Sequence, residues 1–140
     1  MIKLNQATQE DLDEALAKSL SIYHEHPDMF GGNIGRYHSI KWNDTLLGVV
    51  GIDLIWPGVA ALGAVLTHHI YEHPVAFVRI LRKLISFGML DLNVHRVQMD
   101  VQTDYDAGHK MAKALGFEAE GIMKKFGPSK KDYTLYARVD

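Results

Sequence analysis

Residues 112–121 read Ala-Lys-Ala-Leu-Gly-Phe-Glu-Ala-Glu-Gly, and this stretch carries a helix into a strand. Gly116 stands where a helix stops in the left-handed conformation, and Phe117 follows as the apolar residue that packs back on the helix. Upstream, Asp106 is a suitable N-cap for this helix. Helical spacing predicts that its inward residues are Ala107, Met111, Ala114 and Leu115.

Outward from this stretch, strand-like and helix-like segments alternate along the chain. Helices are expected to start at Thr8, where Asp11 would complete a capping box, and at Pro74, which suits a first helical position. Turn residues and alternating apolar positions predict strands over 2–6, 37–42, 45–56, 59–67, 95–103, 117–125 and 132–139. Helices that connect strands in this order imply a mixed sheet with parallel crossovers.

Apolar residues recur at helical spacing in the two longer helices. In the first, the expected inward positions are Leu12, Ala15, Leu16, Ser19, Leu20 and Tyr23. In the second, they are Phe77, Val78, Ile80, Leu81, Leu84, Ile85 and Leu90. Between the first helix and the next strand, residues 24–35 predict an irregular crossing or a short second helix. Gly63 is interpreted as the mark of a bulge in its strand.

The 140 residues suit a single domain spanning 1–140, with 47% hydrophobic and 23% charged residues. The absence of cysteine excludes disulfides and thiolate chemistry, and it fits a reducing cytoplasm. No apolar run approaches the ~18 residues of a membrane span, and no signal peptide is recognisable. The formal charge of -2 gives no reason to expect nucleic acid. We therefore expect a soluble cytoplasmic protein that binds neither membrane nor nucleic acid.

The element order, the stretch 112–121 and the closing Tyr-Thr-Leu-Tyr-Ala-Arg at 133–138 resemble the GNAT acetyltransferase superfamily. The resemblance implies an α/β (α+β) fold: a mixed, mostly antiparallel central sheet with a splayed parallel strand pair and helices on both faces. It implies an N-acetyltransferase that transfers acetyl from acetyl-CoA, as co-substrate, to an amine of a small molecule, protein or peptide by direct attack. Residues 108–121 also resemble GNAT-like proteins of T7-like bacteriophages, which would place the protein in a host cytoplasm. That likeness favours an alternative, a catalytically inactive binding or structural protein associated with the virion or its assembly.

The resemblance also implies where the cofactor binds. The strand before the long helix would offer backbone groups of Val65, Leu66 and Thr67 to the pantetheine arm. The following loop and helix N-terminus would surround the pyrophosphate with amides, through Tyr71, His73, Val75, Ala76, Phe77 and Val78. The usual family loop has Arg or Gln, two residues, Gly, one residue, then Gly or Ala. Here Tyr71, Pro74 and Ala76 occupy those three places, and only Ala76 conforms, so His73 or Arg79 would have to supply positive charge.

Catalysis departs from the family pattern as well. Many members carry a tyrosine four residues before the glycine of the helix stop, where it protonates the leaving thiolate, and this chain has Ala112 there. Tyr105 could donate that proton instead, or it could be a surface tyrosine at a helix start. The strand over 59–67 contains no carboxylate to act as general base.

Imidazole titrates in the range that a general base needs, and His68 and His69 follow that strand. We take His69 as the candidate base, with Asp53 and Asp100 on neighbouring strands as alternatives. A histidine pair without catalytic role is the other interpretation.

Eight histidines raise the question of a metal site. His24 and His26 flank Glu25, and His69 lies four residues before His73. Because Pro74 starts the helix only after His73, this pair lacks helical i, i+4 geometry, and no third ligand is evident. We expect no metal.

The acceptor pocket would be formed by residues 24–37 and the last hairpin, so the acceptor amine stays unidentified. That hairpin also carries a basic cluster, Lys124, Lys125, Lys130 and Lys131. The cluster could attract an acidic substrate or the 3′-phosphate of CoA, or form a solvated turn that discourages edge pairing. The sequence leaves a monomer and a homodimer through this hairpin open.

Overall fold

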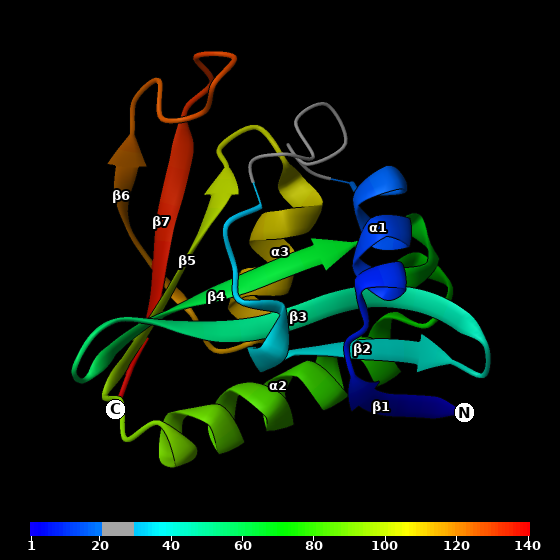
Figure 1. Cartoon of the computed structure of the whole chain (residues 1–140). Helices are drawn as coiled ribbons and strands as arrows, with labels where there is room; N and C mark the ends of the chain where they lie inside the picture. Colours follow the sequence, from blue (N-terminus) through cyan, green and yellow to red (C-terminus); the bar gives the residue numbers. More distant parts are fainter. Residues whose placement is uncertain (21–29) are drawn as a thin grey trace. The chain divides into compact units, whose positions relative to one another are not determined.

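The computed structural model describes residues 1–20 and 30–140 (Figure 1). Its elements follow the predicted order: β1 (Ile2–Gln6), α1 (Gln9–Ala17), η3 (Ile34–Arg36), β2 (Tyr37–Trp42), β3 (Thr45–Trp56), β4 (Val59–Leu66), η4 (His68–Glu72), α2 (Pro74–Asp91), β5 (Arg96–Gln102), α3 (Asp106–Ala114), β6 (Glu118–Met123) and β7 (Tyr133–Val139). The strands form one sheet in the order β1-β2-β3-β4-β5-β7-β6. The predicted mixed, mostly antiparallel sheet with one parallel pair is confirmed.

The chain divides into two compact units. The first contains Met1–Asp53 and Gly63–Ile80, and the second contains Leu54–Leu62 and Leu81–Asp140. Both units are discontinuous in sequence, because β3, β4 and α2 each run from one unit into the other. The single domain expected over residues 1–140 stays a prediction.

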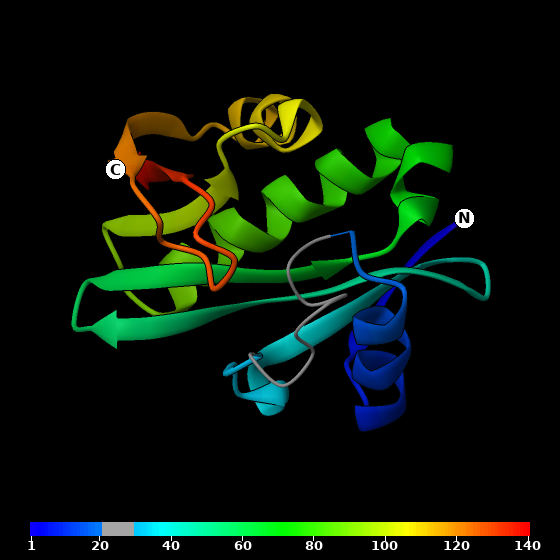
Figure 2. The ribbon, with the colours of Figure 1, turned by 90° about the horizontal axis from the view of Figure 1, so that it is seen from above.

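In the first unit, α1 begins with the predicted capping box. The Asp11 amide donates to Thr8 Oγ1 at 3.1 Å, and the Thr8 amide donates to Asp11 Oδ2 at 3.2 Å. α1 lies against β2 and β3 in Figure 2. Its buried residues join a core of Ala7, Leu12, Ala15, Tyr37, Leu46, Val49 and Val65.

The first helix is shorter than its apolar pattern predicted. It ends at Ala17, so the expectation that Ser19 and Leu20 continue the helical face is wrong. Ser19 instead forms an antiparallel bridge with Thr67. Tyr23 and most of the expected 24–35 crossing lie outside the described residues, and the described end of that segment contains the short η3.

Four residues at four-residue steps are buried along α2: Phe77, Leu81, Ile85 and Met89. The expected inward position Leu90 is wrong, because its side chain is 83% exposed. A four-residue step from Ile85 reaches Met89, so Leu90 lies about 100° away around the helix.

In the second unit, β7 lies between β5 and β6 and pairs antiparallel with both, and β4 pairs in parallel with β5 over Val59–Ala61. The predicted helix stop at the end of α3 is confirmed. Gly116 has φ +91°, its amide donates to the Lys113 carbonyl, and the Phe117 amide donates to the Ala112 carbonyl. This is the Schellman pattern, and Phe117 is buried beside it.

Two details of α3 differ from expectation. Tyr105 is the N-cap in place of Asp106, and its side chain makes no capping hydrogen bond. Ala112 is fully buried, whereas Ala114 is exposed. Because Gly116 ends the helix by turning the chain, Leu115 and Phe117 supply the buried groups at this end.

Candidate functional site

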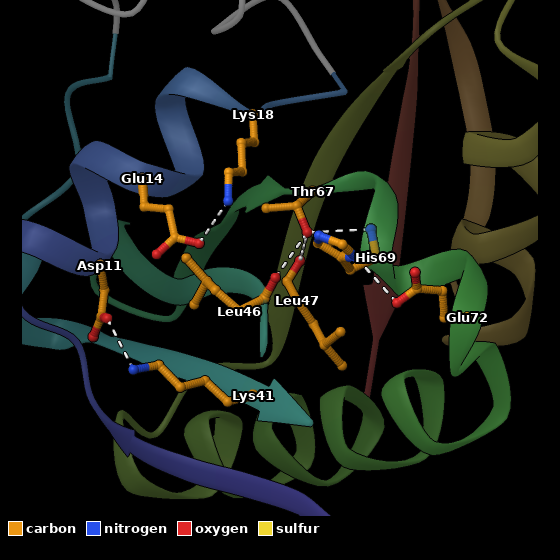
Figure 3. Close-up of polar contacts among 9 residues, drawn as sticks. All are labelled: Asp11, Glu14, Lys18, Lys41, Leu46, Leu47, Thr67, His69 and Glu72. Atoms are coloured by element: carbon orange, nitrogen blue, oxygen red, sulfur yellow. Dashed lines mark hydrogen bonds and ion pairs between the residues drawn. The ribbon is translucent and has the colours of Figure 1, made fainter. Parts of the chain in front are cut away.

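The end of β4 is built around a buried hydroxyl. Thr67 is fully buried, and its Oγ1 donates toward the carbonyls of Leu46 (2.9 Å) and Leu47 (3.2 Å), as Figure 3 shows. The Thr67 amide donates to the Leu47 carbonyl at 2.9 Å. Thr67 therefore anchors the strand end to β3, and its side chain has no part in a surface that could contact a ligand.

The residue before it already has a partner from the N-terminal segment. The Leu66 carbonyl accepts a hydrogen bond from the Leu20 amide at 2.9 Å. The expected contact of Leu66 with a pantetheine arm stays a prediction, and the bond from Leu20 leaves only the Leu66 amide for it. The sequence pattern missed this contact because it placed Leu20 in a helix.

The segment after β4 is a compact 3-10 helix, η4, where a phosphate-binding loop was expected. Thr67 caps it by accepting from the His69 amide at 3.3 Å. The Ile70 amide donates to the Thr67 carbonyl, and the His73 amide donates to the Ile70 carbonyl, both at 3.2 Å. The chain then enters α2 at Pro74. Tyr71 lies on η4 with its side chain half exposed.

The N-terminus of α2 offers two amides. The His73 amide is bound within η4, Pro74 has none, and the Phe77 amide donates to the His73 carbonyl at 3.0 Å. The predicted availability of the Phe77 amide is therefore wrong, and Val78 lies where an α-helix bonds its amide to Pro74. Helix geometry leaves the amides of Val75 and Ala76 without helical acceptors. The first turn of α2 carries no acidic residue whose charge would oppose an anion at the helix N-terminus.

His73 is held at this helix start by an aromatic stack. Its ring lies 3.9 Å from that of Trp42, with an angle of 10° between the planes. Trp42 is the last residue of β2, 31 positions earlier in the chain, so no local pattern could have indicated the pairing. The stack therefore holds the His73 imidazole in place, and His73 directly precedes the helix turn that contains the amides of Val75 and Ala76.

His69, the candidate base, is paired with a carboxylate. Its Nδ1 lies 3.0 Å from Glu72 Oε2 (Figure 3), and its side chain is 25% exposed. In the tautomer whose Nδ1–H donates a hydrogen bond to Glu72, Nε2 carries a lone pair, as a general base requires. Glu72 was not among the predicted site residues, although its position three residues after His69 is a local signal for such a pair.

The other catalytic candidates lie apart in sequence. Tyr105, in the second unit, lies over Gly108, where an added Cβ would be 2.8 Å from its ring. Asp100, also in the second unit, is exposed to water, yet crowding by protein atoms desolvates its carboxylate and raises its pKa. Asp53 lies in the first unit at the end of the buried run of β3, and it accepts a hydrogen bond from the Tyr37 hydroxyl at 2.8 Å.

Within residues 1–20 and 30–140, no three His, Asp or Glu side chains gather in a way that could hold a metal ion. His24, Glu25 and His26 lie outside the described residues. No helix in the described part of the chain is long and apolar enough to cross a membrane.

Of the basic cluster, Lys131 pairs with Asp104, with 3.7 Å between Nζ and Oδ2. Lys125 and Lys130 have positive φ, as turn residues do.

The sequence matches no protein-family model and no curated protein sequence. Solved structures match the fold over nearly the entire chain. RimL, a ribosomal-protein acetyltransferase solved with coenzyme A, has 20% identity and a TM-score of 0.75, covering 99% of this chain and 93% of its own. Ard1 from Thermoplasma volcanium has 12% identity and a TM-score of 0.77, covering 99% and 97%. A GNAT-family acetyltransferase from Bacillus anthracis has 15% identity and a TM-score of 0.73, covering 99% and 94%.

These likenesses rest on the arrangement of elements, since identity is 20% or lower in all three structures. They agree with the element order, the single parallel strand pair and the long helix that follows β4 and η4. The chain therefore has the fold of the GNAT acetyltransferases.

Proposed function

We propose that the protein is an N-acetyltransferase that transfers the acetyl group of acetyl-CoA to an amine by direct attack. The observation that carries this proposal is the N-terminus of α2 in a GNAT fold, where the amides of Val75 and Ala76 lack helical acceptors and no carboxylate lies in the first turn. Such a helix start binds an anion through its N–H groups and its dipole. The diphosphate of CoA is an anion of this kind.

The residues of the first unit would then hold the cofactor as follows. Val75 and Ala76 donate their amides to the diphosphate, and the stacked His73 adds positive charge when protonated. The strand end at Val65 and Leu66 takes the pantetheine arm, with the Leu66 contact limited to its amide because its carbonyl is bound to Leu20. Tyr71, half exposed on η4, packs against the cofactor through its ring.

In the reaction, the nitrogen lone pair of a neutral amine attacks the thioester carbonyl carbon. The C–N bond forms, the C–S bond breaks, and the nitrogen loses one proton while the departing thiolate gains one. His69, oriented by Glu72, is the proposed acceptor of the first proton, and Tyr105 is the proposed donor of the second. Asp100, which the sequence offered as an alternative acceptor, stays a prediction.

Ala76→Glu tests the cofactor site. The substitution sets a carboxylate against the bound diphosphate, so we expect acetyl-CoA binding to become undetectable by isothermal titration calorimetry. The control is Ala114→Glu, which makes the same change at an exposed position of α3 and should leave the affinity unchanged. Circular dichroism checks that both variants are folded. Equal affinity of Ala76→Glu and the wild type would contradict the assignment of this helix start.

A second function is favoured by two positions. Pro74 removes an amide from the anion site, and Ala112, where many family members have the thiolate-protonating tyrosine, is fully buried. Both departures fit a GNAT-shaped binding or structural protein without turnover, and the likeness to phage assembly proteins stays a prediction. Release of free thiol from acetyl-CoA with a panel of amines separates the two: turnover supports the enzyme, and binding without turnover supports the inactive protein.

A further inference from the structure

Tyr37, the first residue of β2, fills a space that three glycines leave open. Its side chain is 1% exposed. A Cβ on Gly63 would lie 1.9 Å from the Tyr37 hydroxyl, one on Gly32 would lie 2.5 Å from it, and one on Gly51 would lie 2.5 Å from the ring. The hydroxyl is therefore enclosed by backbone, which explains a glycine at position 63. The bulge expected at Gly63 stays a prediction.

The structure identifies an acceptor for the enclosed Tyr37 hydroxyl. It donates to Asp53 Oδ2 at 2.8 Å, and Phe30 packs edge-on against the ring with centroids 5.2 Å apart. Asp53 is half-buried at the point where β3 leaves the core. All of these residues belong to the first unit.

The charge of Asp53 has no counterpart in the described chain. Among residues 1–20 and 30–140, no lysine, arginine or histidine nitrogen lies within 4.0 Å of its carboxylate. Asp11, the buried carboxylate of the same unit, is paired with Lys41 at 3.2 Å. A partly desolvated carboxylate is stabilised when a cation comes to it.

The hydrogen bond from the Tyr37 hydroxyl does not by itself require a carboxylate as its acceptor. An amide or backbone carbonyl would accept from the hydroxyl without placing a charge in a half-buried position. A carboxylate can accept several hydrogen bonds, and Tyr37 uses one. The Asp53 carboxylate thus has no cation within 4.0 Å among residues 1–20 and 30–140, and the Tyr37 hydroxyl fixes its orientation.

We propose that Asp53 binds the ammonium group of the acceptor and that Tyr37 is the positioning residue for its carboxylate. The acceptor class is a primary alkylamine, which is charged at neutral pH; it binds as the ammonium ion, releases one proton to water, and then attacks the thioester as the neutral amine. This inference rests on the proposed function. The Tyr37 hydroxyl lies beside Gly63 of β4, and Gly63 is two residues before Val65, which is proposed to contact the cofactor on the same strand. Gly32 and Phe30 belong to residues 24–37, which the sequence predicts to form part of the acceptor pocket.

The experiment compares two acceptors of different charge. Pentylamine is an ammonium ion at pH 7, whereas a ring-substituted aniline is neutral, and thiol release from acetyl-CoA measures the acetylation of either. We expect Asp53→Asn to raise KM for pentylamine about tenfold, as loss of one charge-assisted contact does, with KM for the aniline and the acetyl-CoA affinity unchanged. Tyr37→Phe should raise the same KM by about threefold, because the carboxylate stays but is less well oriented.

Two further variants keep the test decisive. Asp13→Asn removes an exposed carboxylate of α1 and should change neither KM. Asp53→Glu keeps the charge and should retain part of the preference for pentylamine. If Asp53→Asn does not fold, Tyr37→Phe takes its place, and an unchanged KM for pentylamine in that variant overturns the proposal.

The outcomes are distinguishable. Wild-type protein that binds no acetyl-CoA overturns the proposed function, and this inference falls with it. An active Asp53→Asn variant that keeps the wild-type preference for pentylamine overturns the role of Asp53 alone. A variant that loses activity equally toward both amines overturns it too, because a structural role would lower both.

Discussion

Gly63 and Tyr37 show how closely single residues are fitted in the first unit. An alanine at position 63 would set its methyl 1.9 Å from the Tyr37 hydroxyl, so the ring or the strand has to move. We expect Gly63→Ala to lower the free energy of unfolding by about 1–3 kcal/mol, the usual cost of overpacking a core. Urea denaturation followed by tryptophan fluorescence measures the change.

Gly121→Ala is the matched control for this substitution. Gly121 also lies in a strand, and a Cβ built there meets nothing within 4 Å. Its alanine variant should change stability by less than about 0.5 kcal/mol. A similar small change for Gly63→Ala would mean that Tyr37 is free to move aside.

At the level of single helices, Gly116 ends α3 through its backbone conformation alone. Its φ is +91°, and a Cβ there would approach nothing closer than 4.0 Å, so a side chain has room but strains the backbone. We expect Gly116→Ala to cost about 1–2 kcal/mol, and Gly116→Asn to cost less, because asparagine tolerates the left-handed region. Thermal denaturation of the two variants measures the difference, and equal costs would contradict a conformational origin.

The start of α1 carries a pH-dependent contribution. Burial disfavours the Asp11 carboxylate, but hydrogen bonds from Thr8 and Lys41 outweigh it and hold the pKa below its ordinary value of 3.8. The folded state therefore binds a proton less readily than the unfolded state. This stabilisation is complete above pH 3.8 and is lost as the pH falls through the lower folded value.

We expect two variants of the capping box to report this contribution. Thr8→Ala should cost about 1 kcal/mol at pH 7, as loss of an N-cap does. Asp11→Asn should remove the part of the acid-induced loss of stability that lies below pH 3.8, as measured by urea denaturation between pH 2 and 7. An unchanged acid profile in Asp11→Asn would show that other carboxylates account for that loss.

At the scale of the whole molecule, a ligand that binds only the folded chain raises its stability. Acetyl-CoA at 100 times its dissociation constant would add about 2.7 kcal/mol. For 140 residues this corresponds to a rise of several degrees in Tm. Differential scanning fluorimetry should show the rise for wild-type protein and no rise for Ala76→Glu. An equal rise in both would place the cofactor elsewhere.

The sequence predicted the elements of the fold because their signals are local. The capping box joins Thr8 and Asp11, Pro74 starts α2 through its own ring, and Gly116 and Phe117 stop α3 within one turn. Each signal depends on residues no more than five positions apart. The order of these elements was enough to indicate the GNAT fold, which the solved structures confirm.

The contacts that shape the candidate site were decided by tertiary structure. Leu20 bonds to Leu66, Trp42 stacks on His73, and Tyr37 donates to Asp53, across 16 or more positions of sequence. A repeating pattern reports which face of an element is apolar, but it carries no information about which distant residue the folded chain brings to that face. The sequence by itself therefore determined the kind of fold, and it predicted a strand and a helix for the cofactor. Only packing between distant segments decided which backbone groups stay available and which carboxylate has no cation nearby among the described residues.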